Sequence, residues 1–110
     1  MLVATQTTAI LKVGGPAESV QAPGAAAISL NGVSLEATFR LEPGGLSVVV
    51  RGFDGADPDG TRVSGKLLLK LGERRVIRIR RAYCGAPTHF IITRIGDGVQ
   101  ISAEGPPPHG

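Results

Sequence analysis

Several residue types that often define a protein's chemistry are scarce in this chain. Among its 110 residues there is one cysteine, Cys84, so no disulfide can form within the chain. Tryptophan is absent, and aromatic residues make up only 4% of the sequence. The core must therefore be built mainly from Val, Ile, Leu and Ala, which bury less area per residue than aromatic side chains do.

The motifs that would identify a catalytic or metal site are also missing. No GxSxG, HExxH or CxxC occurs. The segment 55–61 has the glycine spacing of a phosphate-binding loop, but no lysine precedes Thr61, and Asp57 and Asp59 would repel phosphate. The same two acids match the middle of an EF-hand loop whose two end ligands are absent. With Asp54 they form at most a weak cation site, and an ordinary Asp/Gly/Pro turn is the better interpretation.

One pair of residues, Cys84 and His89, invites a nucleophile–base interpretation. They are five positions apart, and Arg80 and Arg81 would favour the thiolate. However, no third group is in place to orient the imidazole, and a lone cysteine is usually a small apolar filler. The only other histidine, His109, is in the C-terminal tail, so a zinc site is hard to assemble. We expect no enzyme activity, no cofactor and no bound metal.

The N-terminal region does not have the pattern of a targeting segment. No Lys or Arg precedes Lys12, and Thr and Gln occupy positions where a signal peptide needs an apolar run. No stretch approaches the roughly 18 apolar residues of a membrane span. We therefore expect no membrane partner and no secretion by a classical signal peptide. The expected location is the cytoplasm, or a particle assembled inside a cell.

What the chain does contain is strand-like alternation broken by glycine and proline. Its clearest local signal is Asn31-Gly32, the pair best suited to the two positive φ angles of a type I′ turn. From Val33 to Leu41, apolar residues alternate with polar ones as in a half-buried strand. Strands are expected at 5–13, 27–30, 33–41, 46–53, 61–71, 75–81, 88–95 and 99–103, with 16–26 as a loop.

About eight short strands at a spacing of about ten residues, with no helical pattern, predict an all-β fold. The expected architecture is an antiparallel β-sandwich or barrel. It should form a single domain over residues 1–104, followed by a disordered Pro-rich tail at 105–110.

Positive charge is concentrated in one segment, 62–81. It holds eight of the twelve Lys and Arg residues and a single acid, Glu73. A tight turn at Gly72-Glu73 would make this segment a basic hairpin. If every second residue of these strands points into the core, the residues between them would present cations on the other face. Their spacing would suit phosphates or acidic side chains. Those candidate partner- or phosphate-binding residues are Arg62, Lys66, Lys70, Arg78 and Arg80. Against base recognition, only Tyr83 lies nearby as a stacking platform. The alternative without a binding function is that these cations lie on edge strands and prevent edge-to-edge aggregation.

Several strands carry apolar residues on both faces, which a two-layer sandwich does not need. They are the runs 48–50, 67–69, 76–77 and 91–92. Isolated apolar residues on a surface are normal. Four such places among so few strands indicate instead that part of the outer surface is covered by another subunit. The candidate interface residues are Val49, Leu68 and Val76.

Two functions from different classes remain open at this point. The first is a non-enzymatic structural subunit that packs with protein subunits, its own copies or others. It would form a homo-oligomer or a decorating or connecting protein of a particle such as a phage virion. The alternative is a basic β-barrel that binds the nucleic-acid backbone through the 62–81 hairpin.

Overall fold

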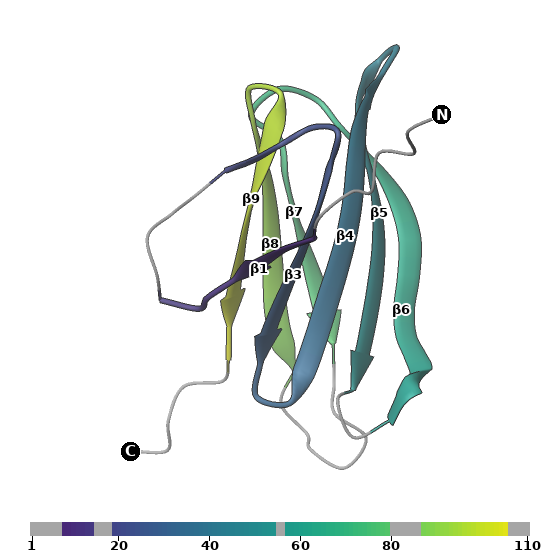
Figure 1. Ribbon diagram of the computed structural model, residues 1–110, viewed down its shortest axis with the longest axis vertical. Helices are drawn as coiled ribbons and strands as arrows, with labels where there is room; N and C mark the ends of the chain where they lie inside the picture. The colour runs from purple at the N-terminus through teal and green to yellow at the C-terminus, as the bar shows by residue number, and fades with distance from the viewer. Residues whose placement is uncertain (1–7, 15–18, 55–56, 80–86, 106–110) are drawn as a thin grey trace, which may run out of the picture.

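The chain forms two β-sheets packed face to face, as seen in a computed structural model that describes residues 8–14, 19–54, 57–79 and 87–105 (Figure 1). For residues 57–62 only the backbone is described. One sheet has five strands in the order β1-β3-β4-β5-β6, and the other has four in the order β2-β9-β8-β7. The strands are β1 (Thr8–Leu11), β2 (Val20–Gln21), β3 (Gly24–Leu30), β4 (Val33–Glu42), β5 (Gly45–Asp54), β6 (Asp57–Leu69), β7 (Arg74–Ile79), β8 (Thr88–Ile95) and β9 (Gly98–Glu104). The predicted all-β fold is confirmed.

The turn between β3 and β4 has the predicted geometry. Asn31 has a φ of 55° and Gly32 a φ of 81°, both positive as a type I′ turn requires. The turn pairs Leu30 with Val33 and thereby sets the register of the whole hairpin. In β4 the residues of one parity, from Val33 to Phe39, are buried, and the intervening ones are not. Leu41 has the same parity but is exposed, contrary to expectation.

The core lies between the two sheets and is mostly aliphatic. Two phenylalanines, Phe39 from the five-stranded sheet and Phe90 from the four-stranded sheet, are its largest buried side chains. Around them, the largest fully buried aliphatic residues are Ile28, Val33, Leu35, Leu46, Val48, Leu69, Ile79, Ile92 and Val99. These residues come from both sheets, so burying them holds the two layers together.

The first strands depart from the prediction. Segment 16–26, expected to be a loop, contains β2 and the first residues of β3. β1 pairs with β3 in parallel, so the five-stranded sheet is not purely antiparallel. Between them the chain crosses to the four-stranded sheet, where β2 pairs with β9, and then returns to the five-stranded sheet as β3. Strand β2 has two residues, too few for an alternation pattern to be detected.

The basic segment does not form the hairpin expected from the sequence. β6 is an edge strand of the five-stranded sheet, whereas β7 is an edge strand of the four-stranded sheet. Their connection is a turn in which the amide of Glu73 donates a 2.9 Å hydrogen bond to the carbonyl of Lys70, with Gly72 at a φ of +79°. The turn is where the sequence predicted it. It carries the chain from one layer to the other, so both strands lie along one side of the sandwich.

No helix in the described part of the chain has the length and apolar character needed to cross a membrane. The Pro-rich tail expected at 105–110 lies outside the described residues except for Gly105.

Candidate interaction surface

The three apolar residues predicted to lie outside the core are all exposed. Val49 on β5 is 52% exposed, Leu68 on β6 47% and Val76 on β7 45%. Val49 and Leu68 share the outer face of the five-stranded sheet, where Val49 pairs with Lys66 and Leu68 with Ser47. They are therefore diagonal neighbours on adjacent strands. Val76 is on the outer face of the other sheet, next to Ile91, so the three residues do not form one patch.

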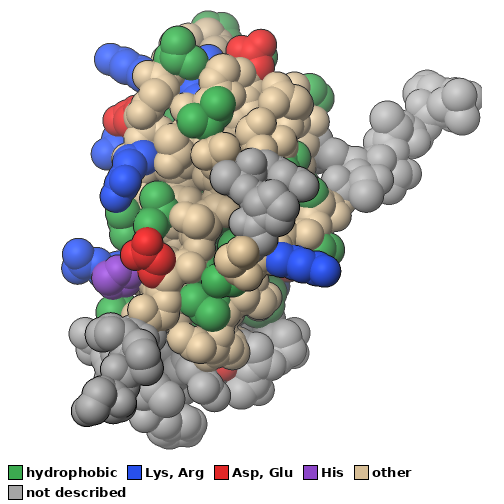
Figure 2. Space-filling view, turned by 90° about the vertical axis from the view of Figure 1, so that its left-hand side faces the viewer, with side chains coloured by type: hydrophobic (Ala, Val, Ile, Leu, Met, Phe, Trp, Pro, Cys, Tyr) green, Lys and Arg blue, Asp and Glu red, His purple; other side chains and the backbone are tan. Residues whose placement is uncertain are grey.

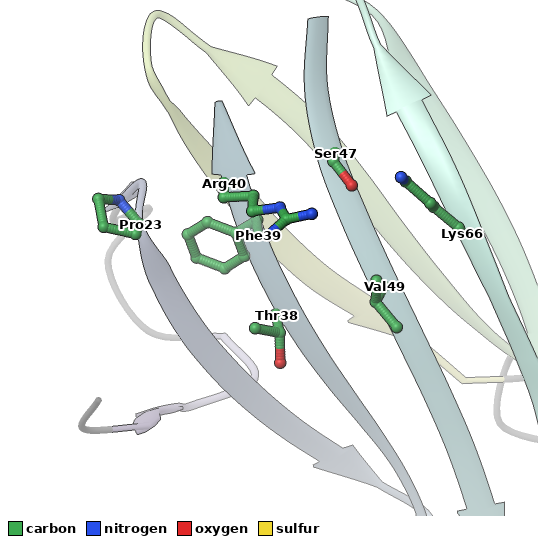
Figure 3. A pocket seen from close by; sticks show the side chains of 7 residues that line it. All are labelled: Pro23, Thr38, Phe39, Arg40, Ser47, Val49 and Lys66. Atoms are coloured by element: carbon green, nitrogen blue, oxygen red, sulfur yellow. The ribbon is translucent and has the colours of Figure 1, made fainter. Parts of the chain in front are cut away.

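The outer face of the five-stranded sheet is hollowed around Val49. The hollow has a volume of about 340 Å³ and is lined by Pro23, Thr38, Phe39, Arg40, Ser47, Val49 and Lys66. Figure 3 shows Arg40 of β4 and Lys66 of β6 pointing toward each other across β5, with Ser47 between them. Although Ser47 has outward parity, it is only 2% exposed. The lining includes no carboxylate, histidine or cysteine, so it offers no general acid–base pair.

A three-residue ion cluster lies beside this hollow. The Glu42 carboxylate accepts a 3.0 Å hydrogen bond from Arg40 Nε and lies 3.4 Å from Lys66 Nζ. The bond from Arg40 lowers the pKa of Glu42, partial burial opposes this, and Lys66 lowers it further. Because the pKa of Glu42 is lowered in the folded protein, these contacts stabilise the fold at pH values above the ordinary pKa of a carboxyl group. They are lost as the pH falls through the lowered value.

We use the name mixed-charge face for the outward-pointing residues of β4, β5 and β6 on this sheet. At one end it carries the cluster of Arg40, Glu42 and Lys66. Toward the other end, Glu36 pairs across the ladder with Arg51, whose guanidinium lies 5.1 Å from the centre of the Phe53 ring. The uncharged residues Thr38, Ser47, Val49 and Leu68 lie among these charges, with Val49 directly opposite Lys66 and Ser47 opposite Arg40. The face thus places exposed apolar side chains between charges of both signs.

The basic residues singled out from the sequence do not share a face. Lys66 points outward from the five-stranded sheet, and Arg78 points outward from the four-stranded sheet, where it pairs with His89. Lys70 lies in the turn between them. The Arg62 side chain and all of Arg80 lie outside the described residues. In the view of Figure 2, Lys and Arg side chains lie mainly along the left margin of the molecule, and another lies on the opposite side.

The other candidate sites from the sequence gain no support. His89 is half-buried on β8 between Arg78 and Glu104 in the ladder, and Cys84 lies outside the described residues. Asp54 is buried at the end of β5, while the side chains of Asp57 and Asp59 are not described. Among the described residues no group of three His, Cys, Asp or Glu side chains is placed to hold a metal ion.

Sequence reasoning missed most of the hollow. Pro23 was assigned to a loop, and Arg40 and Ser47 were each only a polar position in an alternating strand. These three residues are brought together by the pairing of Arg40 with Ser47 and by the return of the chain into β3. The alternation of apolar and polar residues within one strand indicates which face of the sheet each residue takes. It does not indicate which strands are neighbours.

Comparisons of the chain with protein-family models, with curated proteins and with solved structures found no match.

Proposed function

We propose that this protein is a non-catalytic structural subunit that assembles with copies of itself through the mixed-charge face. The observation that carries the proposal is the exposure of Val49 and Leu68 as diagonal neighbours beside a hollow on that face. Covering the water-exposed apolar side chains beside this hollow with a second surface lowers the free energy of the protein in water. A homo-oligomer inside a cell is the simplest such assembly, and a particle such as a virion is a larger one.

The charges on this face favour a second copy as the partner. Glu36, Glu42, Arg40, Arg51 and Lys66 provide both signs on one surface. A face that carries both signs can meet its own copy with opposite charges opposed, as a two-fold interface requires. Binding of a nucleic-acid backbone is supported less well, because Lys66 and Arg78 point away from opposite sheets and Glu42 already pairs with Lys66.

The proposal is tested by sedimentation velocity of the wild-type protein and of Leu68→Asp over a range of concentrations. We expect the wild type to sediment as an oligomer of the 11.3 kDa chain. Leu68→Asp should be a folded monomer because it replaces an exposed apolar side chain of this face with a charge that would lose its water on assembly. Leu41→Asp is the matched control. The Leu41 side chain is 48% exposed, nearly the same fraction as that of Leu68, but it points to the opposite face of the sheet.

The proposal is wrong if the wild type stays monomeric, if Leu68→Asp assembles normally, or if Leu41→Asp disrupts assembly equally. If Leu68→Asp does not fold, Val49→Glu makes the same test from the neighbouring strand.

A further inference from the structure

Among the described strands, the longest one at a sheet edge is β6, and it is paired on one side only. β6 spans Asp57–Leu69, and within the described residues it pairs only with β5. Its regular part, from Val63 to Leu69, pairs without interruption with Leu46–Gly52. The edge of a sheet presents backbone N–H and C=O groups that can pair with another extended chain.

The apolar side of β6 is incompletely covered along this edge. Leu69 is fully buried, but Val63 and Leu67 are only half-buried although they point toward the interior. Gly65, between them, is exposed, and a Cβ at that position would have no neighbour within 4 Å. On the facing strand β7, Ile77 is also only half-buried. A segment that paired with β6 would place every second side chain over this gap and cover it.

The described side chains along this edge, from Val63 to Ile79, carry charge almost entirely of one sign. They include Lys66 near the end of β6, Lys70 just after it, Arg74, Arg75 and Arg78 on β7, and one acid, Glu73. Asp57 and Asp59 lie at the start of β6, where side chains are not described. Glu73 is bound to Arg75 at 3.1 Å and to the backbone amide of Lys70 at 3.0 Å. Among the described residues, the side chains of Lys70, Arg74 and Arg78 have no hydrogen-bond or ion-pair partner.

We infer that the edge of β6 binds an extended acidic segment of a partner protein by adding it as a further strand of the five-stranded sheet. The open backbone and the uncovered apolar gap select an extended segment with alternating apolar residues, and Lys66 and Lys70 select acidic residues on its other side. Pairing of β6 with β6 of a second copy is disfavoured by like charge. The edge shares β6 with the mixed-charge face but uses the backbone edge of the sheet and not its outer face, so the inference goes beyond the proposed function and does not depend on self-assembly.

The test uses a fluorescein-labelled peptide, EVEVEVE, whose length matches Val63–Leu69. Fluorescence anisotropy should show saturable binding that weakens by about tenfold or more between low salt and about 0.3 M salt. The composition-matched peptide EEEEVVV, which cannot alternate, and the basic peptide KVKVKVK should each bind at least tenfold more weakly. Amide hydrogen exchange should slow within Val63–Leu69 when EVEVEVE is bound, because new hydrogen bonds protect that edge.

A pair of charge reversals locates the site. Lys70→Glu should weaken binding of EVEVEVE at least threefold. Lys12→Glu makes the same change in net charge just after β1, at the far edge of the same sheet, and should leave binding unchanged. Both variants change exposed side chains, and thermal melting verifies that they are folded. Repeating the titration with Val49→Ser, which removes an apolar side chain of the mixed-charge face on β5 without adding a charge beside β6, should give wild-type affinity, which separates this inference from the proposed function.

The inference is overturned if EVEVEVE does not bind, if EEEEVVV binds equally well, or if exchange slows elsewhere than β6. It is also overturned if a labelled single-stranded 20-nucleotide DNA binds more tightly than the peptide. Slowing of exchange in β6 with protein concentration alone would show that a second copy occupies the edge instead.

Discussion

At the scale of single residues, two glycines lie at positions where a side chain would point between the two sheets. The space available to such a side chain differs between them. A Cβ on Gly52 of β5 would run into the Ile79 side chain of β7 and lie 3.6 Å from the Cβ of Val63. A Cβ on Gly65 of β6 would meet nothing within 4 Å. Gly52 therefore lets the two sheets approach closely, whereas Gly65 lies where they leave a gap.

Alanine substitutions at these two glycines should act in opposite directions on stability. Gly52→Ala is expected to lower the free energy of unfolding by about 1–3 kcal/mol, because the added methyl overpacks the contact with Ile79. Gly65→Ala is expected to raise it by up to about 1 kcal/mol, because alanine loses less backbone entropy in a strand and meets no neighbour. Urea unfolding measures both, and equal losses would contradict this account of the gap.

At the scale of elements, Arg94 of β8 ties both sheets to the turn between β6 and β7. Its Nη1 donates a 3.0 Å hydrogen bond to the carbonyl of Leu69, and its Nε donates one of 2.9 Å to the carbonyl of Gly96. Its backbone amide donates a 2.9 Å bond to Glu73, and its carbonyl accepts one of 3.3 Å from Gly72. These bonds fix where the chain leaves one layer and enters the other.

Replacing Arg94 with Met should keep the apolar stem but remove both side-chain donors. The partly buried carbonyl of Leu69 would lose its side-chain donor, so we expect a loss of about 1–3 kcal/mol in the free energy of unfolding. Arg40→Met is the control, since the Arg40 side chain is exposed and an ion pair at the surface contributes little to stability. Equal losses in urea unfolding would show that Arg94 does not hold the connection.

The elements also show why the sequence predicted some connections and not others. The hairpin at Asn31-Gly32 was predicted correctly because its two positive φ angles are a local requirement that few residue pairs meet. The turn at Gly72 was also predicted correctly, but a tight turn alone does not determine whether the next strand joins the same sheet or the other one. The choice here depends on Arg94, some twenty residues further along the chain. For the same reason β2 and the parallel pairing of β1 with β3 were not predicted, because both depend on which strands become neighbours.

The candidate surface was partly predictable in the same way. Two-faced apolar runs correctly placed Val49, Leu68 and Val76 outside the core, because alternation alone decides which face a residue takes. The hollow, and the separation of Lys66 from Arg78, depend on strand order, which alternation does not encode.

At the scale of the whole molecule, charge divides the surface into two regions with different expected partners. The mixed-charge face surrounds Val49 and Leu68 with charges of both signs, which suits another copy of the chain. The described side chains of β6 and β7, from Val63 to Ile79, carry mostly cations, which suits an acidic segment. Both surfaces include β6, but the proposed assembly uses the outer face of the sheet and the proposed acidic segment uses its backbone edge.

The central claim is that the mixed-charge face is covered in the assembled protein, and methyl NMR with a soluble paramagnetic agent measures this directly. As protein concentration rises, the methyl groups of Val49 and Leu68 should become shielded from the agent. Those of Leu41 and Leu71, which are also exposed in the single chain, should stay accessible. Shielding of Val76 on the opposite sheet in their place, or accessibility of Val49 and Leu68 that does not change with concentration, would contradict the claim.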